Sequence, residues 1–412
     1  MTHALRNTSA NRGAAAQFAA VTRSTTAKLS LGARRIPVYC GEFWTAKQRQ
    51  AASIHEISYR ACFKPQLPAY FISRLTEPGE VVYDPFCGRG TTAIEAALHG
   101  RRVIANDVNP LSAILTRPRL ELPDLEAIAA RLAQIRSRAN AGSAPDLSMF
   151  FHRDTLNEIT SLRNYLRRRH AEGDEDAVDR WIRMVATNRL TGHSKGFFSV
   201  YTLPPNQATS PANQIKINRK LRQKPEHRDT RAIILKKSHQ LQRKLSADER
   251  RCLHTAAAGA QFLTSTADNT KKIREGFVQL TVTSPPFLDV VQYASDNWLR
   301  CWFNGLDADA IAPRITMSRT LDEWNAQMAR VFAELHRVTK RGGWVAFEVG
   351  EVRKGKIRLE EHVIPLGLDA GFSCEALLIN QQRFTKTANI WGVGNNRLGT
   401  NTNRIAVFRK LR

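Results

Sequence analysis

The segment at residues 84–92, which reads D-P-F-C-G-R-G-T-T, constrains the fold more than any other part of the chain. It follows the apolar run at residues 81–83, and its two glycines, Gly88 and Gly90, permit a sharp turn and a close backbone approach to a ligand. A helical pattern comes next, and then a second apolar run at residues 103–106. The pattern predicts a strand, a tight turn, a helix and a strand, the unit from which parallel α/β sheets are built.

Other segments predict how the sheet continues. Strand-like runs occur at residues 261–263, 278–282, 344–349 and 405–408, whereas the region between about 120 and 258 has mostly helical, polar patterns. The simplest architecture is one α/β domain with a doubly wound, mostly parallel sheet. In this architecture the chain leaves the sheet after the second strand, builds a helical insertion and returns.

Charge gives the first indication of a partner. Lys and Arg number 62 against 37 Asp and Glu, a formal net charge of +25. This excess favours a polyanionic partner, nucleic acid first, although a basic surface that serves only solubility has the same composition.

The six cysteines lack metal-ligand spacing, so no metal is expected. Neither a signal peptide nor an apolar run of roughly 20 residues is recognisable, so we expect a cytoplasmic protein with no membrane partner.

The turn at residues 84–92 has competing interpretations. Its glycine spacing matches the loose pattern of dinucleotide-binding folds, and Asp107 lies where a ribose hydroxyl is bound. A phosphate-binding loop does not fit, because the second glycine is followed by two threonines. The Asp84 carboxylate would repel a pyrophosphate, but it suits the ammonium and sulfonium groups of S-adenosylmethionine. The residues therefore favour methyl transfer over hydride transfer.

Residues 283–287, T-S-P-P-F, directly follow an apolar strand, which places them where open α/β sheets bind ligands. The two prolines remove two N–H donors and leave carbonyl oxygens and a serine hydroxyl as acceptors. An exocyclic amine can donate to these acceptors, which directs its nitrogen lone pair toward a methyl sulfonium. The final phenylalanine offers a face on which an extruded base stacks. The predicted catalytic residues are Ser284, Pro285, Pro286 and Phe287.

Together the two segments resemble the amino-methyltransferases of DNA, which combine a D-P-F-x-G-x-G-T cofactor loop with an S/D/N-P-P-Y/F catalytic loop. The resemblance covers roughly residues 55–120 and 260–410. It implies a Rossmann-like methyltransferase fold, S-adenosylmethionine as cofactor and direct transfer without a covalent intermediate. The cofactor-binding residues that it implies are Phe63, Lys64, Asp84, Pro85, Phe86, Cys87, Gly88, Gly90, Thr91, Asp107 and Asp268.

The order of the two loops divides the chain. The cofactor loop comes first and the insertion lies between the loops, an order that resembles the group whose target-recognition region has this position. The expected parts are a basic, mobile N-terminal arm at 1–50, a cofactor-binding half at 51–119, a mainly helical insertion and candidate target-recognition region at 120–258, and a catalytic half at 259–412.

The residue before the two prolines bears on the target atom. In this family a Ser-Pro-Pro loop resembles the cytosine-N4 enzymes, whereas Asp or Asn at that position is more usual for adenine N6. We expect cytosine N4 in DNA, with adenine N6 in DNA, a base in RNA, and non-catalytic nucleic-acid binding as alternatives. Methylation at carbon 5 of cytosine is disfavoured, because it needs a cysteine nucleophile and the chain has no Pro-Cys dipeptide.

The insertion carries a local excess of positive charge. Residues 214–251 hold 13 Lys or Arg against four acids, a composition that suits phosphate contacts and equally suits a solvated helix face. Residues 187–198 mix polar, basic and aromatic side chains, and residues 389–396 form a Gly- and Asn-rich loop that either lines the base pocket or simply connects strands. The nucleic-acid-binding residues predicted are Lys195, Lys216, Arg219, Lys220, Arg222 and Lys224.

Overall fold

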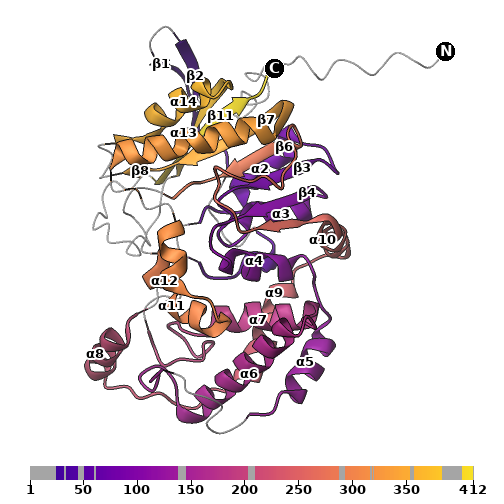
Figure 1. Ribbon diagram of the computed structural model, residues 1–412, viewed down its shortest axis with the longest axis vertical. Helices are drawn as coiled ribbons and strands as arrows, with labels where there is room; N and C mark the ends of the chain where they lie inside the picture. The colour runs from indigo at the N-terminus through magenta and orange to yellow at the C-terminus, as the bar shows by residue number, and fades with distance from the viewer. Residues whose placement is uncertain are drawn as a thin grey trace, which may run out of the picture.

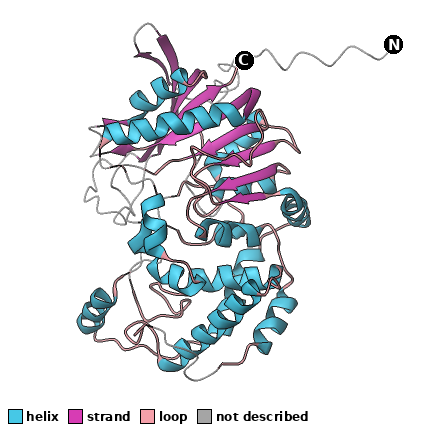
Figure 2. Ribbon diagram, viewed as in Figure 1, coloured by secondary structure: helices cyan, strands magenta, loops and turns pink. Residues whose placement is uncertain are grey.

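A sheet covered by helices forms one part of the molecule, and a lobe made of helices forms the other (Figures 1 and 2). Among the described residues, no helix combines the length and the apolar character required to cross a bilayer. The computed structural model describes residues 25–31, 34–44, 51–59, 62–137, 145–202, 209–286, 293–315, 318, 320–352, 357–382 and 401–411.

The sheet has nine strands. In hydrogen-bonded order they are β1 (Thr25–Leu31), β2 (Arg34–Gly41), β10 (Ser373–Gln382), β11 (Asn401–Arg409), β7 (Thr339–Val349), β6 (Val278–Thr283), β3 (Val81–Asp84), β4 (Arg102–Asn106) and β5 (Gln261–Leu263). From β7 to β5 all neighbours are parallel, whereas β11 runs antiparallel to both β7 and β10. The predicted doubly wound, mostly parallel sheet is confirmed. Its strand order reverses between β3 and β6, where such sheets bind ligands.

Helices cover both faces of the sheet. One face packs against α2 (Gln66–Leu75), α3 (Thr91–Leu98) and α10 (Ala247–Gly259), and the other packs against α13 (Leu321–Val338) and α14 (Leu359–Asp369). Strand β7 contributes side chains to the cores on both faces of the sheet. Trp344 and Ala346 pack on the α2, α3 and α10 side, and Val345 and Phe347 pack on the α13 and α14 side. Burial on both sides explains the continuous apolar runs of the central strands.

The lobe is built from the insertion. The tryptophan Trp181 is fully buried there and donates from Nε1 to Ser238 Oγ at 2.9 Å. Helix α10 packs on α3 and β4 and belongs to the sheet layer, so the lobe ends before residue 247 rather than at 258. The lobe helices are α5 (Leu125–Gln134), α6 (Arg153–Ala171), α7 (Ala177–Arg189), α8 (Pro211–Leu221) and α9 (Thr230–Gln242).

Short elements complete the connections between the two parts. Helix α11 contacts α6 and α7, and α4 contacts α7. The connecting elements between the parts and within them are η2 (Ser53–His55), α4 (Leu111–Thr116), η3 (Arg117–Arg119), α11 (Tyr293–Asn304), α12 (Ala308–Ile311) and η4 (Ala312–Arg314). A separate two-stranded pair, β8 (Glu351–Val352) and β9 (Ile357–Arg358), lies between β7 and α14 in the sequence.

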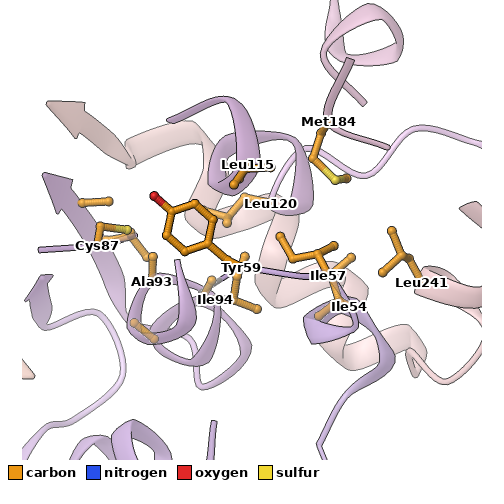
Figure 3. Packing of buried hydrophobic residues seen from close by; sticks show 14 of the residues in the cluster. Ile54, Ile57, Tyr59, Cys87, Ala93, Ile94, Leu115, Leu120, Met184 and Leu241 are labelled. Atoms are coloured by element: carbon orange, nitrogen blue, oxygen red, sulfur yellow. The ribbon is translucent and has the colours of Figure 1, made fainter. Parts of the chain in front are cut away.

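A buried apolar cluster joins the lobe to the sheet (Figure 3). The ring of Tyr59 lies beside Cys87 of the turn after β3, whereas Ile57 points toward Met184 of α7 and Leu241 of α9. Because these side chains form one continuous core, the lobe is held firmly against the loops at the end of the sheet.

The N-terminal segment differs from its prediction. A mobile basic arm was expected at residues 1–50, but residues 25–31 and 34–41 form β1 and β2 at the edge of the sheet; the first 24 residues lie outside the described part. Strand β2 pairs in parallel with β10, with Val38 opposite Leu377. The partner lies more than 300 residues away, so local composition alone gave no signal for this strand.

Candidate active site

Two glycines shape the turn between β3 and α3. The φ angles of Gly88 and Gly90 are +53° and +81°, values that residues with a side chain rarely adopt. A Cβ atom at Gly90 would lie only 2.3 Å from Thr116 Oγ1, at the end of α4. The turn therefore needs glycine both for its backbone conformation and for close packing against the neighbouring helix.

Asp107, directly after β4, holds the turn from the side. Its Oδ2 accepts a hydrogen bond from the Gly88 amide at 2.8 Å, and its Oδ1 accepts one from the Asn109 amide at 2.9 Å. Burial raises the pKa of the carboxyl to about 6, although both amides act in the opposite direction. Each carboxylate oxygen has a further lone pair, so Asp107 can still accept a hydrogen bond from a ligand hydroxyl.

Asp84, the last residue of β3, is almost fully buried at 1% exposure. Its Oδ1 accepts hydrogen bonds from the Thr283 hydroxyl at 2.7 Å and from the Phe86 amide at 3.1 Å. Burial, with a smaller contribution from the nearby Asp107 charge, raises the pKa of Asp84 to about 7, although the hydrogen bonds to its carboxylate act in the opposite direction. Asp84 therefore lies behind the turn and connects it to the end of β6.

A pocket of about 660 Å³ opens at the carboxyl ends of the central strands. The turn after β3, the end of β4, the loop after β5 and the loop after β6 all contribute to it. Gly88 and Ser284, which are far apart in the sequence, thus face the same pocket. Its lining residues are Tyr59, Pro85, Phe86, Gly88, Asp107, Val108, Asn109, Thr266, Ala267, Ser284, Pro286, Arg314 and Ile315.

The Ser-Pro-Pro loop leaves β6 at the topological switch of the sheet. Ser284 and Pro286 line the pocket, while Pro285 is buried. The indole Nε1 of Trp324, from α13, donates a hydrogen bond of 3.0 Å to the Pro286 carbonyl. This bond anchors the second proline to the helix layer. Phe287, the last predicted catalytic residue, lies outside the described residues.

Glu348, near the end of β7, is an acid that the sequence analysis missed. It is 7% exposed and accepts hydrogen bonds from the Ser284 side chain and from Asn403 of β11. Burial raises its pKa to about 7. The available signal was one glutamate inside the otherwise apolar run at residues 344–349; Trp324 and Tyr59 gave no comparable local signal.

Several predicted cofactor residues lie outside the pocket wall. Phe63 and Lys64 precede α2, and Cys87 and Thr91 are buried behind the turn. Asp268 lies in a groove next to the pocket, where its Oδ2 accepts hydrogen bonds from Gln327 at 3.1 Å and Arg330 at 3.2 Å. Burial acts to raise the pKa of Asp268, but hydrogen bonds from Thr266, Arg330 and Gln327 together hold it below its usual value. Its predicted contact with an adenine amine stays a prediction.

The basic residues predicted to bind nucleic acid lie on the lobe. Lys195 and Lys224 line one groove of about 560 Å³, and Lys216, Arg219 and Lys220 lie on α8. Arg222 caps that helix in a left-handed conformation, with φ of 49°. The charged run at 214–251 is not one surface, however, because Lys237 of α9 is only 7% exposed. The glycine-rich loop at 389–396 lies outside the described residues.

The profile of the DNA methylase family matches residues 23–112, a stretch that includes the turn after β3 and Asp107. Over this stretch the chain is similar to the DNA amino-methyltransferase family. Over 84 residues it is 29% identical to the type II methyltransferase M.MjaII of Methanocaldococcus jannaschii, a match that covers 20% of this chain and 16% of that protein.

Solved structures of other proteins resemble this chain only distantly. The rRNA methyltransferase aviRa of Streptomyces viridochromogenes is 13% identical, with a TM-score of 0.36 and coverage of 89% of this chain and 92% of that one. TrmN of Thermus thermophilus is 11% identical, with a TM-score of 0.34 and coverage of 87% and 52%.

The match to the DNA methylase family supports S-adenosylmethionine as the cofactor, and the pocket has groups that fit it. Asp107 would offer carboxylate oxygens to a ribose, and Gly88 would place no side chain between the backbone and the ligand. Two buried carboxyls whose pKa values are raised, Asp84 and Asp107, gain from a nearby positive charge. A cationic sulfonium would supply that charge, whereas a pyrophosphate would increase the repulsion.

Proposed function

We propose that this chain transfers a methyl group from S-adenosylmethionine to the exocyclic amine of a base in DNA, with cytosine N4 as the target atom. The observation that carries the proposal is the shared pocket, in which Ser284 and Pro286 lie together with Gly88 and Asp107. One side of the pocket suits a sulfonium ligand, and the other presents hydrogen-bond acceptors to an amine. Methyl transfer requires the methyl group of the sulfonium and the amine nitrogen to lie within bonding distance of each other.

The acceptors polarise the amine. S-adenosylmethionine, when bound, supplies the methyl group on a sulfonium. The amine donates its two hydrogens to Ser284 Oγ and to the Pro285 carbonyl, which localises the nitrogen lone pair. On transfer the nitrogen would form a bond to that methyl carbon, and the sulfur would leave as a neutral thioether. The surplus amine proton passes to Ser284 Oγ while the serine proton passes to Glu348, its hydrogen-bond partner.

Trp324 selects which carbonyl of the loop is available. The bond from its indole occupies the Pro286 oxygen, and neither proline has an amide that could close an internal turn. The Pro285 carbonyl is then the loop acceptor left for the amine. Trp324 acts here as a positioning residue, because it holds the loop without contacting the base.

The serine supports cytosine N4 over adenine N6 because the Ser-Pro-Pro loop resembles that of the cytosine-N4 enzymes. A serine hydroxyl both accepts from the amine and donates to Glu348, whereas an ionised aspartate in its place only accepts. The base must leave the helix to reach this pocket, and Phe287 is proposed to stack against it. Adenine N6 is the alternative target within the same mechanism.

The lobe is proposed to hold the DNA. Lys195, Lys216, Arg219, Lys220, Arg222 and Lys224 are proposed as its phosphate- and base-contacting residues. A net charge of +25 supports a polyanionic partner, and contacts of this kind weaken as salt increases.

A labelled-methyl digest tests reaction, polymer and atom together. Duplex DNA and total RNA are incubated separately with the protein and S-adenosylmethionine carrying a labelled methyl group, then digested to nucleosides and analysed by mass spectrometry. We expect label in N4-methylcytosine from DNA. Label in N6-methyladenine changes the target, label only in RNA changes the polymer, and no label in either overturns the proposed activity.

The Ser284→Ala variant is the matched control. It removes the hydroxyl that accepts from the amine and leaves the Asp107 side of the pocket intact. We expect cofactor affinity near that of the wild type and turnover lowered by roughly 10²- to 10³-fold, the scale of losing one oriented hydrogen-bonding group. Normal turnover in Ser284→Ala would show that the loop is not catalytic.

A further inference from the structure

Helix α8 is exposed on nearly every side. Gln214 is its only buried residue, and Figure 1 shows the helix at the edge of the lobe, away from the sheet. Three of the four exposed large hydrophobic residues in the described part of the chain lie on or beside it, namely Tyr201 at 47%, Ile215 at 38% and Leu221 at 49%. A helix with so little buried apolar surface is marginal by itself, so it needs another source of stability or a partner.

Side-chain amides fix the orientation of α8. Gln214 Nε2 donates to the Tyr201 carbonyl at 3.0 Å, and Asn218 Nδ2 donates to the Met149 carbonyl at 2.8 Å. Gln223, just beyond the helix, also donates to the Tyr201 carbonyl, at 2.9 Å. Ser210 caps the amino end, and Pro211 begins the first turn. The helix is therefore held along one face by directional bonds rather than by apolar packing.

The face opposite these anchors is cationic. Gln214 and Asn218 are one turn apart, and at about 100° per residue Lys216, Arg219 and Lys220 point the other way. All three are exposed, and within the described residues none of them forms an ion pair or a side-chain hydrogen bond. Residues 209–225 contain no acid to neutralise them. The surface consists of an oriented helix whose outward charges have no side-chain partner among the described residues.

We infer that α8 enters the major groove of duplex DNA, with Arg219 reading a guanine and Lys216 and Lys220 binding the flanking phosphates. This inference rests on the proposed function for its partner. The major groove of B-DNA, about 12 Å wide, admits an α-helix, and Arg matches the two acceptors of guanine in that groove. The deep, narrow major groove of A-form RNA excludes a helix, so the geometry of α8 selects duplex DNA.

A DNA-binding assay that needs no methyl transfer tests the proposed phosphate contacts of Lys216 and Lys220. Fluorescence anisotropy with a labelled DNA duplex is measured across a salt series for the wild type, for Lys216→Ala combined with Lys220→Ala, and for Lys236→Ala. Lys236 is an exposed lysine of α9 and serves as the matched control. We expect the double variant to bind roughly tenfold more weakly and to lose about one unit of salt slope per lysine, while Lys236→Ala behaves like the wild type. An unchanged slope, or equal competition by duplex RNA, overturns the inference.

Sequence readout tests Arg219 separately. Arg219→Lys keeps the positive charge but loses the bidentate hydrogen bonding that matches guanine. We expect nearly unchanged affinity for random DNA, together with relaxed preference at one base pair when bound sequences are selected from a random duplex pool. An unaltered preference overturns the role of Arg219. Because neither measurement needs methyl transfer, their failure is distinguishable from failure of the proposed activity, which the labelled-methyl digest reports.

Discussion

The Thr283 hydroxyl donates a hydrogen bond of 2.7 Å to Asp84 Oδ1. Thr283 is the residue immediately before Ser284, and Asp84 begins the turn that carries Gly88. This side-chain bond therefore connects the two segments that contribute to the pocket, and it is buried at both ends. Buried hydrogen bonds to charged groups are stronger than neutral ones, so this contact fixes the register between the two loops.

Replacing Thr283 by valine should loosen this connection. The substitution keeps the shape and leaves Asp84 with one donor fewer, so we expect the unfolding free energy to fall by about 1–3 kcal/mol and turnover to fall with it. Thr281 is the matched control, because its Oγ1 is buried on the same strand and has no hydrogen-bond partner among the described residues. Thr281→Val should be neutral or stabilising in denaturant unfolding. Equal losses in both variants would contradict the role of the bond.

Trp324→Phe should separate catalysis from binding. The variant preserves an aromatic side chain in the core but frees the Pro286 carbonyl, so the loop can adopt more than one arrangement. We expect kcat to fall about tenfold, roughly 1.4 kcal/mol, with the cofactor Kd unchanged. Trp344→Phe, on β7 and outside the pocket lining, controls for loss of a buried indole. If both variants reduce kcat and Tm equally, Trp324 has only a packing role.

Methyl transfer should depend on the ionisation of Glu348. Burial raises its pKa to about 7, and only the ionised carboxylate accepts the proton from Ser284. The single-turnover rate at saturating cofactor should therefore rise with pH up to about 7 and then level off. Glu348→Gln should be slow and should lose this dependence. A variant that retains the wild-type pH profile would assign the titration to another group.

Cofactor affinity should also depend on pH. Burial raises the pKa of Asp107 to about 6 and that of Asp84 to about 7, so both carboxyls ionise as pH rises from 5 to 8. We expect affinity for S-adenosylmethionine, which carries a positive sulfur, to increase over this range more than affinity for S-adenosylhomocysteine, whose sulfur is neutral. Calorimetric titration of both ligands measures the difference. Parallel pH profiles for the two ligands would rule out the electrostatic role.

Asp84→Asn should stabilise the protein at alkaline pH. The unfolded carboxyl has a pKa near 3.9, so between about pH 4 and 7 the folded chain keeps a proton that the unfolded chain has lost. The stability contribution of Asp84 is therefore lost as pH rises through that window. Asparagine keeps the acceptor oxygen without the charge, so we expect a gain of about 1 kcal/mol or more at pH 8 and none near pH 4. A gain independent of pH, measured by urea unfolding, would contradict this origin.

The sequence by itself determined the elements with local signals. The apolar runs and glycine spacing around residues 81–106 predicted β3, the turn, α3 and β4, because strand burial and positive φ angles depend on nearby residues. The Ser-Pro-Pro loop was recognisable for the same reason, since prolines restrict their own backbone.

Only the tertiary structure decided which distant groups meet. Strand β2 exists because β10 pairs with it across the sheet edge, and Glu348 contacts Ser284 because β6 and β7 are parallel neighbours. Trp324 reaches Pro286 only because α13 covers that face. Such contacts depend on strand order and packing between segments far apart in the chain, and no local pattern of residues records them.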